Sequence, residues 1–125
     1  MSLLDITVEI GERGPVVRLS GEADTSVAGR LGDALNAQIT ADTRCLTVDL
    51  SGLRFADSAA VRTLIDAHLA LKKQGGTLEL ASPQPLVARS LSLLGVDQVI
   101  PVRPQVGPEP VDGPLRDADS ATPAS

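Results

Sequence analysis

Residues 45–61, CLTVDLSGLRFADSAAV, constrain the fold of this chain more than any other stretch. The mainly apolar run over residues 46–50 predicts a buried strand, and Ser51-Gly52 predicts a short turn after it. Asp57 and Ser58 then stand directly ahead of a long helical pattern. A side chain at such a junction lies on the surface, beside backbone N–H groups that the first helical turn leaves unpaired. Ser58 is therefore the first candidate functional residue.

The residues before this stretch predict a hairpin followed by a helix. Residues 3–9 and 16–20 alternate between apolar and polar side chains, and the Gly- and Pro-containing segment between them is typical of a turn. An apolar stripe at helical spacing then predicts a helix over residues 25–40. The side chain of Asp24 or of Thr25 is expected to cap it.

The residues after Ser58 predict two helices and two strands. The first helix is expected to end at Gly75-Gly76, and residues 77–81 alternate as a short strand does. Ser82-Pro83 is expected to cap and open a third helix that ends at Gly95. Val99 and Ile100 are candidates for a last short strand.

This order of elements predicts an α/β fold. We expect a mixed, mostly parallel sheet of four or five strands, packed with three or four helices on one or both faces. The hydrophobic fraction of 42% suffices for one core, although Phe55 is the only aromatic residue. Six of the nine prolines fall after residue 100, so we expect a domain over 1–100 and a disordered tail over 101–125.

Composition excludes several classes of function. The formal net charge of −5 argues against nucleic acid as a partner, because phosphate binding needs a basic surface. One cysteine, Cys45, and one histidine, His68, cannot build a four-ligand zinc site. No apolar stretch approaches the roughly 20 residues of a membrane span, and the amino terminus lacks signal-peptide character. We therefore expect a cytoplasmic protein without membrane insertion.

An enzyme is not expected. Ser58 and His68 lie ten residues apart in one predicted helix, about 15 Å along its axis, so the histidine cannot activate the serine. No phosphate-binding or dinucleotide-binding glycine motif is present. Asp24, Asp49 and Asp57 could be imagined as a magnesium site, but helix caps and a strand end are the expected roles. No catalytic residue, metal or cofactor is predicted.

The motif DLSGLRFADS at residues 49–58 resembles the signature of the STAS domain, the fold of the anti-sigma-factor antagonists. The segments GEAD at 21–24, GGTLELAS at 75–82 and PLVARSLSLLGV at 85–96 resemble further parts of that family in the same order. The resemblance covers residues 3–100.

The resemblance implies a bacterial partner switch. In the antagonist branch, the serine after the aspartate is phosphorylated by an anti-sigma factor that is itself a serine kinase. The unphosphorylated antagonist binds the anti-sigma factor and releases a sigma factor, which activates transcription, and a protein phosphatase restores that form. The phosphate acceptor would be Ser58, in a partner-binding surface formed by Asp24, Asp57, Ser58, Ala59 and Arg62.

Two departures from the family pattern leave alternatives open. Ala59 replaces a serine or threonine, and Ala60 replaces a glycine, where its methyl group is expected to face a partner's backbone. A STAS adaptor that is never phosphorylated, serving a transporter or a stress-signalling assembly, is therefore the second hypothesis. The simplest interpretation of Ser58 is a helix cap worth about 1 kcal/mol.

Overall fold

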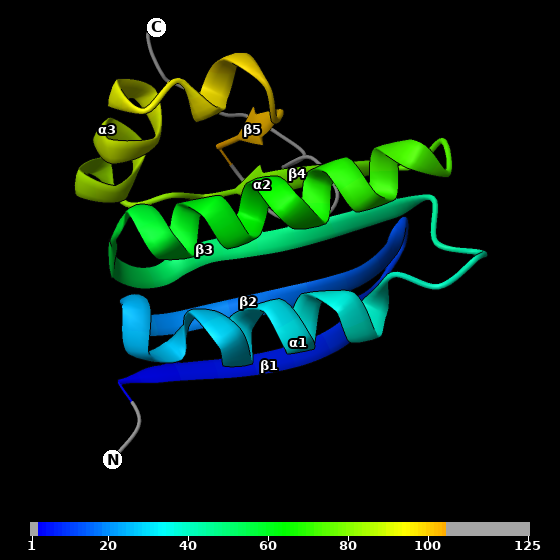
Figure 1. The fold of residues 1–125 in the computed structure, drawn as a ribbon, viewed down its shortest axis with the longest axis horizontal. Helices are drawn as coiled ribbons and strands as arrows, with labels where there is room; N and C mark the ends of the chain where they lie inside the picture. Colours follow the sequence, from blue (N-terminus) through cyan, green and yellow to red (C-terminus); the bar gives the residue numbers. More distant parts are fainter. Residues whose placement is uncertain (1–2, 105–125) are drawn as a thin grey trace, which may run out of the picture.

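The computed structural model describes residues 3–104, which form a mixed five-stranded sheet with three α-helices and two short 3-10 helices (Figure 1). In chain order the elements are β1 (Leu4–Gly11), β2 (Gly14–Ala23), η1 (Thr25–Val27), α1 (Ala28–Gln38), β3 (Cys45–Ala56), α2 (Ser58–Lys73), β4 (Thr77–Ala81), α3 (Pro85–Leu93), η2 (Val96–Gln98) and β5 (Val102–Arg103). The predicted α/β class and mostly parallel sheet are confirmed.

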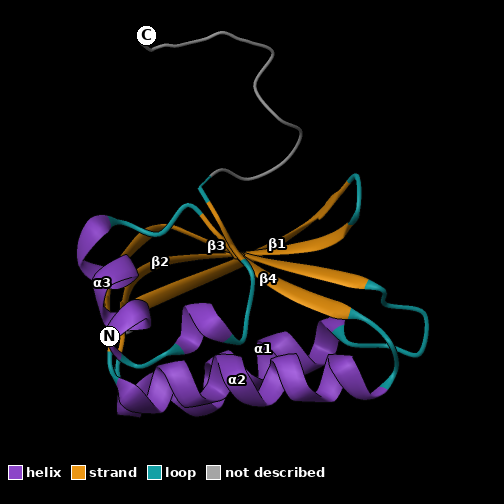
Figure 2. Cartoon of the chain, turned by 90° about the horizontal axis from the view of Figure 1, so that it is seen from above, coloured by secondary structure: helices purple, strands orange, loops and turns teal. Residues whose placement is uncertain are grey.

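The strands lie in sequence order, β1-β2-β3-β4-β5. The predicted hairpin pairs β1 with β2 antiparallel, and each later strand is parallel to the one before it. Helices α1 and α2 lie side by side on one face of the sheet (Figure 2). Because β2 and β3 are parallel, their carboxyl ends lie at the same end of the sheet, where η1 and α2 begin.

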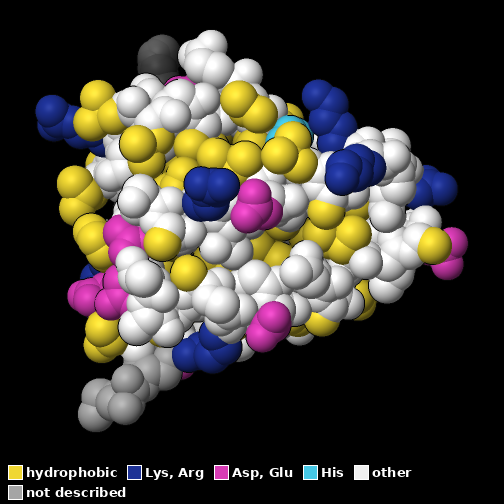
Figure 3. All heavy atoms as spheres, in the orientation of Figure 1, with side chains coloured by type: hydrophobic (Ala, Val, Ile, Leu, Met, Phe, Trp, Pro, Cys, Tyr) yellow, Lys and Arg dark blue, Asp and Glu magenta, His cyan; other side chains and the backbone are white. Residues whose placement is uncertain are grey.

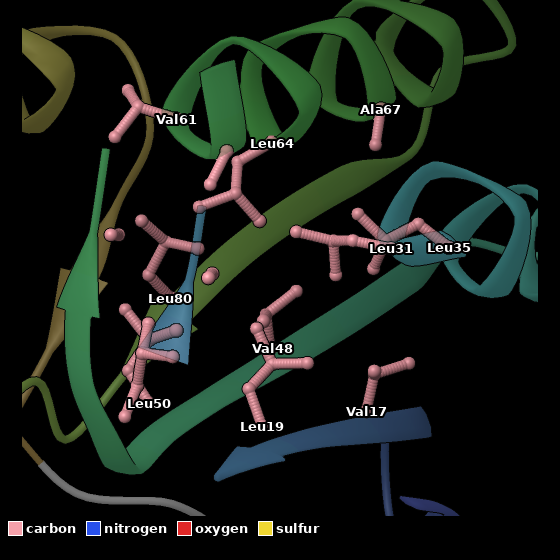
Figure 4. Packing of buried hydrophobic residues seen from close by; sticks show 14 of the residues in the cluster. Val17, Leu19, Leu31, Leu35, Val48, Leu50, Val61, Leu64, Ala67 and Leu80 are labelled. Atoms are coloured by element: carbon pink, nitrogen blue, oxygen red, sulfur yellow. The ribbon is translucent and has the colours of Figure 1, made fainter. Parts of the chain in front are cut away.

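The core fills the space between the sheet and its helices, and it is almost entirely aliphatic. Figure 4 shows Val48 and Leu50 of β3 between the sheet and the helices, with Leu31 of α1 and Leu64 of α2 on the helical side of this space. These side chains are at most 2% exposed, so aliphatic residues pack this interior without an aromatic side chain.

The predicted end of the third strand is wrong. Strand β3 runs on through Ser51 and Gly52 to Ala56, and the expected turn is a β-bulge. Arg18 pairs with Asp49 and Ser20 pairs with Gly52, so β3 advances by three residues while β2 advances by two. An extra residue of this kind bends the strand without ending it, and it reverses which face the following side chains occupy.

A second register shift follows where Gly21 pairs with Leu53 and Glu22 with Phe55. Buried apolar side chains in β3 therefore recur every third residue, at Leu50, Leu53 and Ala56. Strict alternation cannot produce this spacing, which is why the sequence pattern indicated a turn.

Two other boundaries differ from prediction. Helix α3 begins at Pro85 with Gln84 before it, so Ser82-Pro83 does not open the helix, and Ser82 has a positive φ of 56°. The last strand is Val102–Arg103, and Val99 and Ile100 instead close the η2 segment. The predicted tail begins at Pro101, and its residues 105–125 lie outside the described residues.

The face of the sheet opposite α1 and α2 carries paired charges. Asp49, in the middle of β3 and not at its end as predicted, is only 3% exposed at its side chain. It binds Arg18, and it accepts a hydrogen bond from the Ser51 backbone N–H at 2.9 Å. The carboxylate of Glu79 is bound by Arg13 and Arg103. Buried carboxylates need such partners, so this network satisfies the polar side of the sheet.

Candidate functional site

Two aspartates cap neighbouring helices at the end of the sheet where β2 and β3 finish. Asp24 caps η1 and accepts a hydrogen bond from the Ser26 N–H at 2.9 Å. Asp57 caps α2 and accepts one from the Ala60 N–H at 3.0 Å. The predicted capping roles of both residues are confirmed. Each carboxylate satisfies a backbone donor that the first helical turn cannot pair.

Thr25 joins the two caps. Its hydroxyl donates to Asp57 Oδ2 at 3.0 Å, and the Asp57 N–H donates to the Ala23 carbonyl at 3.0 Å. The sequence indicated Thr25 only as an alternative cap, because a contact between positions 25 and 57 has no local signal. The two hydrogen bonds hold the amino-terminal end of α2 against the end of β2.

The pKa of Asp57 lies below the usual value for an aspartate. The hydrogen bond from the Ala60 backbone N–H is the largest cause, and the Thr25 hydroxyl contributes in the same direction. Both donors favour the charged carboxylate. Asp57 therefore presents a fixed negative charge next to the first residue of α2.

Ser58 is the first residue of α2 and is exposed. The interpretation of Ser58 as the helix cap is wrong, since Asp57 occupies that position. The serine hydroxyl is therefore not needed to cap α2, and Ser58 lies on the surface directly after Asp57.

The other predicted surface residues divide into two groups. Ala59 is half-buried and Arg62, one turn along α2, is exposed, so both lie on the same helix as Ser58. Ala60 is 1% exposed and belongs to the hydrophobic core. The expectation that its methyl group faces a partner is therefore wrong, because the helix turns that position inward.

Phe55 and an ion pair extend this surface. The Phe55 side chain is 45% exposed, and Arg54 lies 3.7 Å from Glu22 across β3 and β2. Apolar and acidic side chains gather along the left edge of Figure 3, the side on which α2 begins in Figure 1. An exposed aromatic side chain beside fixed charges is typical of a protein-binding surface. The sequence did not single out Phe55 as exposed, because the bulges in β3 decide which way it points.

The residues considered for chemistry elsewhere do not join this site. Asp49 lies on the opposite face of the sheet, with Arg18. His68 is buried in α2, and burial lowers its pKa, with a further contribution from the charge of Lys72. Among residues 3–104, no group of three or more His, Cys, Asp or Glu side chains could hold a metal ion. Nor does any helix in this range have the length and apolar character needed to cross a bilayer.

Comparison with known proteins identifies a family. A family model described as "Mlab, STAS domain" matches residues 6–103. The crystal structure of an anti-sigma factor antagonist from Mycobacterium paratuberculosis is 28% identical, with a TM-score of 0.75 over 82% of this chain and 87% of that chain. These matches confirm the resemblance to STAS domains and to their anti-sigma-factor antagonist branch. Among curated protein sequences, none matches this chain significantly.

Two more distant structures share the fold alone. The Bacillus cell fate determinant SpoIIAA in its phosphorylated form is 20% identical, with a TM-score of 0.62 over 78% of this chain and 90% of that chain. A sulfate transporter family protein from Wolinella succinogenes is 17% identical, with a TM-score of 0.64 over 73% of this chain and 76% of that chain.

Proposed function

The chain belongs to the STAS domain family, and we propose that it is an anti-sigma-factor antagonist controlled by phosphorylation of Ser58. The observation that carries the proposal is the exposed Ser58 at the first position of α2, directly after the capping residue Asp57. A kinase needs an accessible hydroxyl, and this one has no capping role to lose. In the proposal Asp24, Asp57, Ser58, Ala59 and Arg62 contact the anti-sigma factor.

Phosphorylation of Ser58 should leave the fold intact. A phosphoserine carries a charge of about −1.5 to −2 at neutral pH. At the amino-terminal end of α2 the helix dipole stabilises such a charge by about 0.3–1 kcal/mol at an exposed position. The neighbouring Asp57 carboxylate repels it, so the two contributions oppose each other. The main consequence therefore falls on the partner and not on folding.

The phosphate charge on Ser58 should weaken binding to the anti-sigma factor. The phosphate would add its charge to two hydrogen-bonded carboxylates, Asp24 and Asp57, at the end of the sheet where β2 and β3 finish. A partner surface that fits the neutral hydroxyl must then bury a doubly charged group without a cation opposite it. An unpaired interfacial charge costs about 2–5 kcal/mol, which lowers affinity roughly 30- to 1,000-fold or more.

Capture from the native cell tests this proposal. Wild-type protein should retain an anti-sigma factor with a serine kinase domain, whereas Ser58→Asp should lose it. Ser92→Asp, at an exposed serine of α3, is the matched control and should bind as wild type does. With the captured partner purified, calorimetry should show weaker binding by Ser58→Asp than by wild type, and these two proteins should melt at similar temperatures. Equal binding by wild type and Ser58→Asp would falsify the switch.

The second candidate is a constitutive STAS adaptor for a transporter or a stress-signalling assembly. Ala59 supports it, because it removes the second hydroxyl that a phosphorylated site could use. Intact-mass analysis of the protein from its native cell separates the two. A phosphate on Ser58 that a phosphatase removes supports the antagonist, whereas capture of a transporter component by a chain never phosphorylated supports the adaptor.

A further inference from the structure

We propose that the chain forms a homodimer in which the β1 strands of two copies pair antiparallel about a twofold axis at Val8. Strand β1 is one edge of the sheet, with β2 as its only strand partner in the described chain. Two copies joined there would share one continuous ten-stranded sheet. The surface around Ser58 lies at another part of the molecule, so the proposal is independent of the proposed function.

Hydrogen bonds identify which backbone groups of β1 point away from the sheet. The Glu22 N–H donates to the Leu3 carbonyl at 2.8 Å, which extends the register in which Gly11 faces Gly14. In an antiparallel pair, alternate residues exchange hydrogen bonds with the partner strand. Odd-numbered residues of β1 therefore bond to β2, and Leu4, Ile6, Val8 and Ile10 direct their backbone groups outward. Arg30 of α1 donates to the Leu4 carbonyl, which leaves residues 6–10 as the edge available to another strand.

The side chains of this segment also favour a partner. Val8 and Ile10 are 43% and 79% exposed, although they lie on the same face as the buried Leu4. Figure 2 shows the β1–β2 hairpin bending away from the helical layer, so α1 does not cover its tip. An extended edge strand with exposed apolar side chains is a template for pairing with another chain.

Residues 6–10 are self-complementary in one register, which favours a second copy as the occupant, and Glu9 is bound by Arg18 of its own chain in every register. With the axis at Thr7, Asp5 would face Glu9 of the second copy, and this like-charge contact would occur twice. With the axis at Glu9, the two Glu9 carboxylates would face each other. With the axis at Val8, Ile6 faces Ile10, Thr7 faces Glu9 and Val8 faces Val8. Like charges directly opposite destabilise a strand pair, whereas apolar pairs stabilise it.

The ends of the paired segment agree with this register. The axis at Val8 places Glu12 of the second copy opposite Leu4, where Arg30 lies. The three apolar pairs, Val8 with Val8 and Ile6 with Ile10 twice, would thus lie between two pairs of opposite charges, each formed by Arg30 of one copy and Glu12 of the other. Because the segment is short, we expect a reversible dimer whose population rises with protein concentration.

The molar mass in solution tests the proposal. Sedimentation of the full chain over a range of concentrations should show the 12.9 kDa monomer converting to a species of twice that mass. Val8→Lys should shift this conversion to at least tenfold higher concentration, because it places two ammonium groups side by side at the axis. Leu93→Lys, at an exposed leucine of α3, is the matched control and should not. Ile10→Lys should act as Val8→Lys does, which keeps the test valid if the first variant misfolds.

A cysteine at the axis tests the register. Paired Cα atoms in hydrogen-bonded antiparallel positions lie about 5.5 Å apart, within disulfide range. In a Cys45→Ser background, Val8→Cys should form a disulfide-linked dimer on mild oxidation, and Leu93→Cys should not. A monomer at every concentration, a dimer that Val8→Lys leaves unchanged, or equal cross-linking of the two cysteine variants would each overturn the proposal.

Discussion

Asp57 lies at the junction of β3 and α2, and its carboxylate accepts two hydrogen bonds there. It follows β3, caps α2 through the Ala60 N–H, and accepts the hydroxyl of Thr25. The first two roles could be predicted from the sequence, because an aspartate before a helical stripe is a typical cap. The third could not, because residues 25 and 57 meet only after the parallel strands pair.

Replacing Asp57 should separate capping from charge. Asp57→Ala removes the acceptor for Ala60, so it should lower the free energy of unfolding by about 1 kcal/mol. Asp57→Asn keeps an acceptor oxygen and should cost less at neutral pH. Urea denaturation of wild type, Asp57→Ala and Asp57→Asn measures the stability that each substitution removes. Equal losses for the two variants would contradict a role for the acceptor.

The charge of Asp57 should make the difference in unfolding free energy between wild type and Asp57→Asn depend on pH. Its pKa is lowered by folding, chiefly by the Ala60 N–H, so its stabilisation is present above the unfolded pKa of about 3.9. It is lost as pH falls through the lower folded pKa. The gap between wild type and Asp57→Asn should therefore narrow in acid. A gap that stays constant down to the acid limit of folding would exclude a charge contribution.

His68 should make stability depend on pH in a different window. Burial, aided by the charge of Lys72, lowers its pKa below the usual 6.5, and its Nδ1 has no hydrogen-bond partner among the described residues. The unfolded chain therefore takes up the proton first, and stability falls as pH drops from about 6.5 toward the lower folded pKa. His68→Leu should remove this loss. Melting temperatures of wild type and His68→Leu at pH 8 and pH 5.5 measure this loss of stability. An equal drop in melting temperature for the two proteins would contradict the role of His68.

At the scale of elements, β3 departs most from its local signals. Two bulges let one strand run from Cys45 to Ala56 and turn Leu50, Leu53 and Ala56 toward the core. A sequence pattern that breaks alternation at Ser51-Gly52 resembles a turn, and only pairing with β2 distinguishes the two. The boundaries of β4 and the end of α2 were predicted correctly, because their glycines and periodic side chains act locally.

Two glycines should respond oppositely to alanine. Gly21 in β2 has a φ of 105°, and an added Cβ would lie 2.1 Å from the Leu3 carbonyl oxygen. Gly21→Ala should therefore destabilise the protein by about 1–3 kcal/mol. Gly29 in α1 has no atom within 4 Å of an added Cβ, so Gly29→Ala should stabilise by up to about 1 kcal/mol. Chemical denaturation measures the two changes in unfolding free energy. Similar changes for Gly21→Ala and Gly29→Ala would contradict the role given to the positive φ of Gly21.

At the scale of the whole molecule, the sheet is completed by a strand of two residues. The Leu80 N–H donates to the carbonyl of Pro101, directly before β5, at 2.9 Å, and the Ser82 N–H donates to the carbonyl of Arg103 in β5 at 2.8 Å. Arg103 also binds the nearly buried carboxylate of Glu79. Pro101 marked a change of composition in the sequence, but the chain keeps folded contacts up to Arg103.

The effect of truncation on stability should therefore depend on whether residues 101–104 are kept. A chain ending at residue 104 keeps every member of the described core, so its free energy of unfolding should change by less than about 0.5 kcal/mol. A chain ending at residue 100 loses β5 and one partner of Glu79, which should cost about 1–3 kcal/mol. Thermal and urea unfolding compare the two. Equal stability would show that β5 contributes nothing.

The sequence by itself determined whatever depends on neighbours in the chain: the α/β class, the helical stripes, the aspartate caps and the family motif around Ser58. Tertiary structure alone decided the bulges in β3, the burial of Ala60, the exposure of Phe55 and the bond between Thr25 and Asp57. Periodicity and capping act over a few residues, whereas these features depend on strands and helices that meet only when the sheet assembles. Both Asp57 and Ser58 were candidate caps in the sequence, and the structure assigned the cap of α2 to Asp57.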